Sequence, residues 1–443
     1  MGDFWIKAAQ LLLSLSILIV LHELGHMIPA KLFKTRVEKF YLFFNPYFSL
    51  FKKKIGETEY GIGWLPLGGF VKISGMVDES MDKDQMSKPP EPWEFRSKPA
   101  WQRLIIMLGG VVVNLILGFL IYMMVLGVWG RDYVKHEHVD FGFSATSVAE
   151  AIGFQDGDQI KSVNGKELFS VLDISRHLLM RGVKTVEVTH PGSNNIVAIE
   201  IPEDFGMTMW TNGQEIPLQP IRTPIIDSVH EESGALAGGM LKGDSITAIN
   251  GDQVQYWYEF AEIVSKDSNT TYTVDVFRNG KIIPLQVKND SVGKFGIECE
   301  SPKDKSMTVS HRDYSFGEAL SEGFAYGYWT LHDYVVQFKY VFTAKGATQI
   351  GGFGAIGKMF PSEWDWHQFW LNTALISIIL AFMNLLPIPA LDGGHVIFLL
   401  WEMVTGRAVS QKIMERAQVV GMVLLLGLLL YANGLDVVKA IFN

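Results

Sequence analysis

One apolar stretch near the N-terminus carries the motif that most constrains this chain. Residues 4–33 are long enough to cross a bilayer as one helix, and positions 22–26 within them read His-Glu-Leu-Gly-His. On a helix, His22 and His26 project from one face, one turn apart. Two neutral imidazoles at that spacing can hold zinc, with Glu23 beside them as general base. Ionisable side chains inside a membrane mark function by default; the alternative is a histidine pair that serves helix packing.

Four apolar stretches of the 443-residue chain can span a membrane, at about 4–33, 104–129, 369–391 and 417–441. Hydrophobic residues make up 48% of the chain, which indicates a membrane protein that also has a substantial polar part. The net charge of -9 gives no reason to expect nucleic-acid binding. Cys299 is the single cysteine, so neither an intrachain disulfide nor a cysteine-based zinc site is expected.

Basic residues near the spans predict the orientation of the chain. The loop after the first span and the short loop after the third are rich in Lys and Arg, whereas both termini are poor in them. The positive-inside rule therefore places both loops in the cytoplasm and both termini on the other side. The long segment at about 130–366 then also lies outside the cytoplasm.

That long segment contains an internal repeat. Residues 157–165, Gly-Asp-Gln-Ile-Lys-Ser-Val-Asn-Gly, recur 86 residues later as Gly-Asp-Ser-Ile-Thr-Ala-Ile-Asn-Gly at 243–251. Each copy predicts a turn, a short strand and an Asn-Gly turn, after a short helix at 149–153 or 234–237. Both units resemble PDZ domains in the circularly permuted arrangement of bacterial proteases. They could bind peptides by adding a strand to a sheet edge, or act as spacers that exclude large substrates by size.

Two further stretches lie close to the spans. Residues 59–73 are apolar, β-prone and glycine-rich, yet too short to span as a helix, and Gly68-Gly69 indicates a turn or bulge. We interpret them as a hairpin or sheet that dips into the membrane beside the motif; an ordinary cytoplasmic hairpin is the alternative. Residues 314–342 predict an amphipathic helix at the membrane surface, followed by a flexible loop at 346–360.

The two histidines require a third ligand, because a catalytic zinc usually takes three protein ligands and keeps one position open for water. Residues 384–395 at the end of the third span read Asn-Leu-Leu-Pro-Ile-Pro-Ala-Leu-Asp-Gly-Gly-His. The two prolines break the helix, so Asp392 can turn inward from an unwound segment. A rise of about 1.5 Å per residue puts Asp392 and His22 in the same half of the membrane. His395, one turn further on, is the rival ligand.

The motifs at 22–26 and 384–393 together resemble the paired signatures of the site-2 protease family of intramembrane zinc proteases. The resemblance covers essentially the whole chain. It implies that Zn²⁺ is held by His22, His26 and Asp392, with Glu23 as catalytic base. It also implies that Asn384 helps to hold the substrate or the developing oxyanion.

Residues 67–72 resemble the membrane-inserted β-hairpin of that family, which implies substrate binding at Gly68, Gly69, Phe70 and Val71. Related proteins often have a proline in the loop at 351–357, which this chain lacks. The expected fold class is a polytopic α-helical membrane protein with four transmembrane helices, a membrane-associated β-hairpin and two inserted PDZ-like α+β domains.

The expected domains follow in chain order. They are transmembrane helix 1 with the zinc motif (1–33), a cytoplasmic loop with the hairpin (34–103), transmembrane helix 2 (104–129), PDZ-like domain 1 (130–220), PDZ-like domain 2 (221–304), a membrane-surface helix and loop (305–365), transmembrane helix 3 with the third ligand (366–392), a cytoplasmic loop (393–416) and transmembrane helix 4 (417–441).

The resemblance implies a multi-pass protein of the bacterial inner membrane, with the PDZ-like domains and both termini in the periplasm. Its expected partners are membrane lipid and membrane-spanning peptides, such as a pre-trimmed anti-sigma factor and remnant signal peptides, in the regulated intramembrane proteolysis of the envelope stress response. Two other interpretations stay open. One is a membrane-anchored zinc protease that cleaves soluble or juxtamembrane segments. The other is an ion or proton transporter that uses the His, Glu and Asp cluster as a relay.

Overall fold

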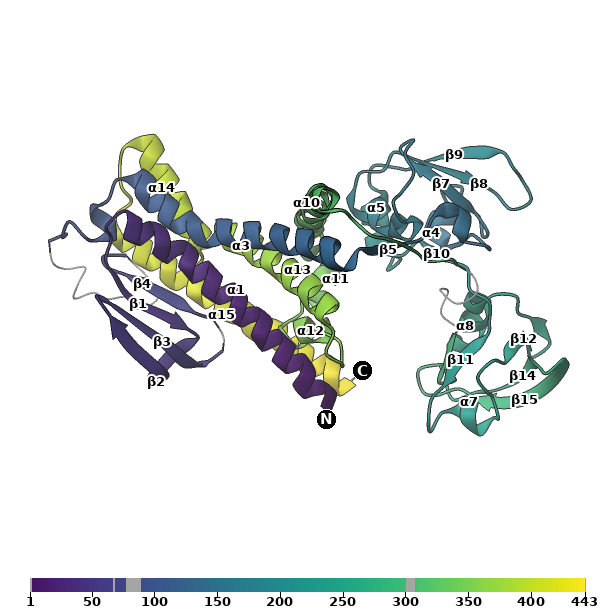
Figure 1. Ribbon diagram of the computed structural model, residues 1–443. Helices are drawn as coiled ribbons and strands as arrows, with labels where there is room; N and C mark the ends of the chain where they lie inside the picture. The colour runs from purple at the N-terminus through teal and green to yellow at the C-terminus, as the bar shows by residue number, and fades with distance from the viewer. Residues whose placement is uncertain (1, 67, 77–88, 300–306, 443) are drawn as a thin grey trace. The chain divides into compact units, whose positions relative to one another are not determined.

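The computed structural model describes residues 2–66, 68–76, 89–299 and 307–442, and it divides into two compact units (Figure 1). The first unit combines the chain up to residue 130 with the chain from residue 313 onward, and the second consists of residues 131–312. The second unit is therefore an insertion between the two halves of the first.

The four expected membrane spans are confirmed. Within the described residues, the helices long and apolar enough to cross a membrane are α1 (Gly2–Leu32), α3 (Ala100–Trp129), α13 (Trp366–Leu385) and α15 (Gln411–Phe442). Helix α13 ends earlier than the expected 391, because Leu386 precedes a proline and takes extended backbone with φ -61° and ψ 145°.

Helix α3 is the centre of the first unit, since it packs against α1, α13, α14 (Asp392–Thr405) and α10 (Phe316–Val341). Helix α10 begins with a capping box formed by Ser315 and Glu318. It crosses α3 closely at Gly323, where a Cβ would lie 2.5 Å from the Met123 Cα. Figure 1 shows α10 nearly end-on at this crossing. The predicted helix at 314–342 is thus present; its place at the membrane surface stays a prediction.

The first loop folds into a four-stranded sheet in the order β2-β3-β1-β4. The strands are β1 (Val37–Leu42), β2 (Phe44–Ile55), β3 (Thr58–Leu65) and β4 (Phe70–Ile73). Strands β2 and β3 form the hairpin, β1 runs parallel to β3, and β4 is antiparallel to β1 at the edge. Residues 59–73 thus belong to a sheet, one of the two forms expected for them, and do not form a hairpin of their own: β3 and β4 lie on opposite sides of β1, so the chain crosses over between them. Leu67, within that connection, lies outside the described residues.

Two predicted loops are helical instead. Helix α14 begins at Asp392 and fills most of the loop expected at 393–416, because its apolar residues Val396 and Leu399 lie on one face and pack into the core shared with α1 and α3. Gly406, with φ 68°, ends this helix. The flexible loop expected at 346–360 contains α11 (Ala344–Gln349) and α12 (Phe353–Lys358).

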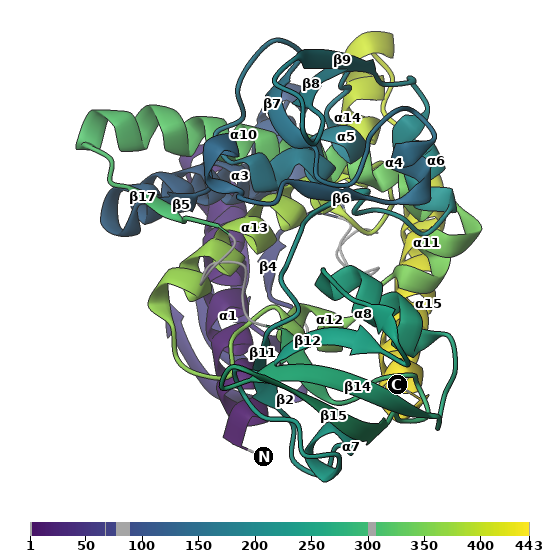
Figure 2. The same ribbon diagram turned by 90° about the vertical axis from the view of Figure 1, so that its right-hand side faces the viewer.

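The second unit has two halves, each with its own apolar core (Figure 2). The first half contains β5 (Arg131–Tyr133), β6 (Phe143–Ala145), α4 (Ser147–Glu150), β7 (Gln159–Val163), α5 (Ile174–Met180), β8 (Thr185–Thr189), β9 (Ile196–Glu200), α6 (Phe205–Thr211) and β10 (Leu218–Pro220), and β5 pairs with β17 (Ser310–Arg312). The second half contains β11 (Ile226–Val229), α7 (Gly234–Ala237), β12 (Ser245–Ile249), β13 (Asp252–Gln253), α8 (Trp257–Ser265), β14 (Thr271–Arg278), β15 (Lys281–Lys288) and β16 (Ile297–Cys299). Residues 300–304, the expected end of the second domain, lie outside the described residues.

The sequence repeat has the same backbone geometry in both halves. Asn164 and Asn250 adopt positive φ angles of 51° and 49°. The Asn164 Oδ1 accepts from the backbone N–H groups of Lys184 and Thr185 at the start of β8, and the Asn250 Oδ1 accepts from the Thr273 N–H of β14. The buried carboxylates at the second repeat position differ in partner: Asp158 pairs with a histidine, whereas Asp244 pairs with the Arg278 guanidinium. The repeat is therefore structural, and its likeness to PDZ domains stays a prediction.

Candidate active site

Helices α1 and α3 approach each other most closely beside the histidine motif. A Cβ on Gly25 would overlap the Gly109 carbonyl oxygen, and a Cβ on Gly109 would overlap the Gly25 carbonyl oxygen. A Cβ on Gly110 would lie 2.6 Å from the His22 Cε1 and would also overlap the His26 Nε2. Small residues at this crossing let the two backbones meet, and they leave room for both imidazoles between the helices.

Three possible ligand atoms converge at this crossing. The His22 Nε2 and the His26 Nε2 are 3.3 Å apart, and each is 3.3 Å from the Asp392 Oδ2. Among the His, Cys, Asp and Glu side chains of the described residues, these three lie close enough together to share one metal ion. His395 lies in the first turns of α14, partly buried, and is not part of this group.

The spacing of these atoms fits zinc. Tetrahedral zinc with bonds of about 2.0–2.1 Å separates neighbouring ligand atoms by about 3.3 Å. The Asp392 Oδ2 is buried and accepts no hydrogen bond from the described residues, so its lone pairs are available to a cation. Two imidazoles and one carboxylate are also a ligand set that catalytic zinc uses.

Both imidazoles contact α3 through their Nδ1 atoms. The His26 Nδ1 donates a hydrogen bond to the Ile106 carbonyl oxygen at 2.8 Å, which leaves Nε2 free to face the other two ligand atoms. The His22 Nδ1 lies 3.2 Å from the Asn114 side-chain amide. Sequence reasoning missed this residue, although a polar amide within the apolar stretch at 104–129 was a visible signal.

Asp392 reaches the histidines from the first residue of α14, rather than from the unwound segment that was expected. The connection before it is held by α15: the Ala390 backbone N–H donates to the Gln418 Oε1 at 3.2 Å, and the Pro389 carbonyl packs on Gly421, where a Cβ would overlap it. Ala390 has a positive φ of 83°, which is strained for a residue with a Cβ. Sequence reasoning missed both contacts from α15.

Glu23 faces the edge strand β4. Its carboxylate lies beside the Val71 backbone N–H. A Cβ on Gly69 would lie 3.6 Å from the Glu23 Cγ, so the backbone there passes directly beside the carboxylate. Phe70 stacks instead on Tyr41, with ring centroids 5.2 Å apart. The structure therefore brings the β4 backbone next to the motif.

The remaining predicted residues lie at the margins of this arrangement. Gly68, with φ 156°, precedes β4 and lies against the Phe44 ring. Asn384 is partly buried in the last turn of α13. Their roles in substrate binding stay predictions.

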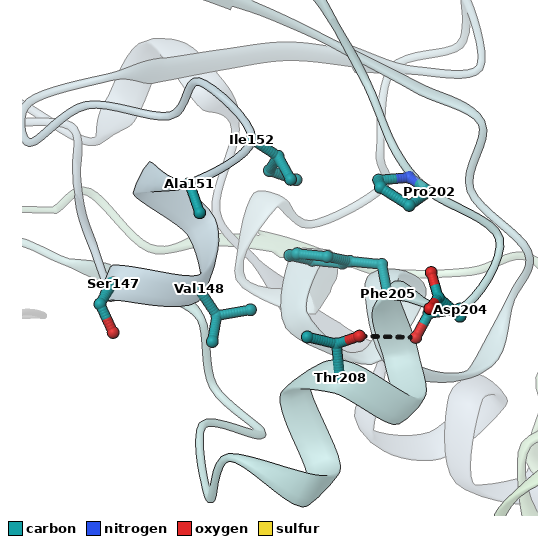
Figure 3. A pocket seen from close by; sticks show the side chains of 8 residues that line it. All are labelled: Ser147, Val148, Ala151, Ile152, Pro202, Asp204, Phe205 and Thr208. Atoms are coloured by element: carbon teal, nitrogen blue, oxygen red, sulfur yellow. Dashed lines mark hydrogen bonds between the residues drawn. The ribbon is translucent and has the colours of Figure 1, made fainter.

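A separate small pocket of about 220 Å³ lies in the second unit between α4 and α6 (Figure 3). Figure 3 shows the apolar side chains of Val148, Ile152 and Phe205 around it, with the Thr208 hydroxyl bonded to the Asp204 backbone. The pocket lining includes one carboxylate and neither histidine nor cysteine, so it lacks the groups that would hold a catalytic metal.

Membrane-length helices packed around an intramembrane His-Glu-x-x-His motif define the class of membrane-embedded zinc metalloproteases. Residues 10–428 match the family model described as Peptidase family M50, and the chain belongs to this family. It is accordingly a zinc metalloendopeptidase of the site-2 protease type, and zinc is its cofactor.

Relatives match nearly the whole chain. The Escherichia coli K12 protein named regulator of sigma-E protease RseP is 27% identical, over 97% of this chain and 99% of its own length. The Yersinia pestis protein named protease RseP is 29% identical, over 97% and 98%, and the Haemophilus influenzae regulator of sigma E protease is 26% identical, over 98% of both. These names disfavour the transporter interpretation.

Proposed function

We propose that this chain cleaves single-span transmembrane segments within the bacterial inner membrane, with zinc held by His22, His26 and Asp392. The observation that carries the proposal is the set of three ligand atoms, each 3.3 Å from the other two. The histidines come from α1 and the carboxylate comes from the first residue of α14, so two segments far apart in the sequence assemble the site.

In this proposal Glu23 acts as the general base. Bound zinc supplies a Lewis acid that polarises a peptide carbonyl and makes water more acidic. Glu23 adjoins His22 in the motif, so its carboxylate can take a proton from the attacking water and pass it to the leaving nitrogen. The Val71 N–H beside this carboxylate would help to hold it in place. Asn384 would help to hold the substrate or the oxyanion.

Strand β4 would present the substrate. Its carbonyls and N–H groups pair with β1 on one side, and no described strand pairs with its other side. A transmembrane helix must unwind before hydrolysis, because its carbonyls are engaged in internal hydrogen bonds. An open strand edge beside Glu23 offers replacement partners to the unwound backbone.

The second unit would lie in the periplasm and control which substrates enter. Its two halves would be the PDZ-like domains expected at 130–220 and 221–304, and the Lys-rich and Arg-rich loops of the first unit would face the cytoplasm. The family resemblance implies a substrate such as an anti-sigma factor whose external part has been removed, and a role in the envelope stress response. Two relatives named as regulators of sigma-E protease support a link to sigma-E. Remnant signal peptides share the same single-span chemistry.

Purified full-length protein in lipid vesicles tests the proposal. We expect one zinc per chain and cleavage inside the apolar segment of a single-span peptide, at a bond identified by mass spectrometry. Cleavage only outside the apolar segment, or only of a soluble control peptide, would favour the membrane-anchored protease instead. Ion flux across the vesicle membrane without peptide cleavage would favour the transporter.

A further inference from the structure

Asn114 is a buried polar residue whose place in the structure the reaction outlined above leaves unexplained. It lies in the middle of α3 and is 1% exposed, among the apolar side chains of a membrane helix. Its backbone carbonyl accepts a hydrogen bond of 2.7 Å from the Ser377 hydroxyl of α13, which fixes the residue between two helices. A buried amide in this setting carries a large energetic cost unless it is hydrogen-bonded.

The contact between Asn114 and His22 determines what the amide does. The His22 Nε2 faces His26 and Asp392, so it must present a lone pair to the metal, and the ring proton must then be on Nδ1. A protonated Nδ1 needs an acceptor, and the Asn114 side chain is 3.2 Å from it. The amide oxygen is the acceptor this atom requires.

The Asn114 amide has the freedom to meet this need. With the amide nitrogen toward His22, its Oδ1 is buried and has no partner among the described residues. A half-turn of the amide exchanges oxygen and nitrogen, which occupy nearly the same space. The His22 Nδ1–H then donates to the Asn114 Oδ1, and the amide nitrogen takes the place that the oxygen occupied.

His26 has a matching contact with helix α3. Its Nδ1 donates to the Ile106 carbonyl oxygen, two turns before Asn114 along α3. Helix α3 therefore holds the Nδ1 of both imidazoles, one through its backbone and one through a side chain. Only the second of these contacts can be removed by substitution.

We propose that Asn114 is a positioning residue of the zinc site, whose amide oxygen accepts the His22 Nδ1–H and fixes the ring with Nε2 toward the metal. The inference rests on the proposed function, since it takes His22 as a ligand. Acceptors behind a ligating histidine fix its tautomer, and losing one weakens metal binding by about 10- to 100-fold.

The test measures zinc affinity of the full-length protein in detergent, by competition with a chromogenic chelator. Asn114→Leu keeps the size of the side chain and removes the acceptor, so we expect zinc to bind about 10- to 100-fold more weakly. Asn114→Asp keeps an acceptor, so we expect its zinc affinity to stay within about tenfold of that of the original protein. This loss is smaller than the loss expected for Asn114→Leu. With cobalt in place of zinc, the visible spectrum of Asn114→Leu should change while that of Asn114→Asp keeps its shape.

The matched control is Thr373→Val. Thr373 is fully buried, and its hydroxyl contacts the Ser14 hydroxyl of α1 at 3.0 Å, so this substitution removes a polar contact to the same helix away from the ligands. A merely structural role for Asn114 predicts that Asn114→Leu and Thr373→Val both lower thermal stability and leave zinc affinity unchanged. That result would overturn the proposal, as would an Asn114→Asp protein that binds zinc as weakly as Asn114→Leu.

Two outcomes separate this inference from the proposed function. If His22→Ala binds zinc as tightly as the original protein, the proposed ligand set is wrong and the inference fails with it. If His22→Ala loses zinc while Asn114→Leu keeps it, the ligand set stands and only the role of Asn114 is refuted. Should Asn114→Leu fail to fold, Asn114→Asp decides the matter, because a loss beyond about tenfold there contradicts an acceptor role.

Discussion

The backbones of Gly25 in α1 and Gly109 in α3 are in direct contact beside the two histidines. A Cβ on either glycine would overlap the carbonyl oxygen of the other. The contact sets the distance between the helix that carries both proposed histidine ligands and the helix whose residues contact their Nδ1 atoms. A change in this distance moves the His22 and His26 rings relative to Ile106 and Asn114 of α3.

Gly109→Ala should therefore weaken zinc binding as well as stability. The added methyl group forces α1 and α3 apart, and overpacking of this kind costs about 1–3 kcal/mol. Thermal unfolding and zinc titration of the purified protein measure the two effects. Gly127→Ala, on the same helix, is the control, since its Cβ would lie at an ordinary 3.4 Å from Ala319. Equal zinc affinity in the two variants would show that the close crossing does not set the site.

Glu23→Gln should keep zinc and lose cleavage. The amide cannot accept the proton from water, whereas the three proposed ligands remain, and general base catalysis contributes about 10²–10⁴-fold. Metal analysis and the cleavage rate of a single-span peptide are measured on the same preparation. Turnover close to that of the original protein would remove Glu23 from the role of base.

Asp392→Ala should lower zinc occupancy together with activity, because it removes one of the three ligand atoms. His395→Ala should leave zinc in place, since His395 is not part of the group. Both variants alter the same segment of α14, so each controls for the other in metal analysis after dialysis. The opposite pattern, with zinc lost only from His395→Ala, would transfer the ligand assignment to His395.

Val71→Pro should impair the cleavage of stable transmembrane helices while zinc is retained. Proline removes the backbone N–H that contacts Glu23 at the open edge of β4. Val71→Ala, which keeps that N–H, is the control for lost packing. Rates are compared for a substrate with a stable helix and for one with helix-breaking residues near the cut. A similar loss on both substrates would show that this N–H acts through Glu23 or the sheet rather than by pairing with the substrate.

Phe70→Pro separates pairing within the sheet from pairing with substrate. Phe70 is the β4 residue opposite Tyr41 of β1, and neighbouring residues of a strand alternate in the direction of their N–H groups. We expect this variant to lose thermal stability, because proline interrupts the β1–β4 ladder.

Removal of the second unit should relax substrate selection without stopping hydrolysis. Strands β5 and β17 pair where the chain enters and leaves that unit, with Tyr133 opposite Ser310, so an Asn-Gly turn can replace residues 134–309 and close a hairpin. The shortened enzyme should cut a single-span substrate with or without its folded external domain. The full-length enzyme should prefer the trimmed substrate. Identical preferences in the two enzymes would contradict a size filter.

The parts of the fold that follow from local pattern could be predicted. The four spans are long apolar runs, and the spacing of His22 and His26 places them on one helix face wherever that helix lies. The Asn-Gly turns of the repeat are equally local, and Asn164 and Asn250 adopt the positive φ angles that such turns require.

The parts of the fold that depend on contacts between distant segments could not be predicted from the sequence. Nothing within residues 59–73 shows that β1 lies between β3 and β4, because strand order is set by pairing with residues far along the chain. Gly109 and Gly110 look like ordinary glycines of an apolar helix until α1 is packed against them. Asn114 was visible as a polar residue, but its partner 92 positions away was not.

Helix α15 contacts other segments of the first unit at two places. Near its start, Gln418 and Gly421 hold the connection that leads to Asp392. About 20 Å further along, Asn433 and Asp436 accept hydrogen bonds from the first backbone N–H groups of α12. The last helix supplies none of the proposed ligands, yet it contacts both the segment before Asp392 and the start of α12. A tilt of α15 in the bilayer would therefore move a proposed metal ligand and α12 together.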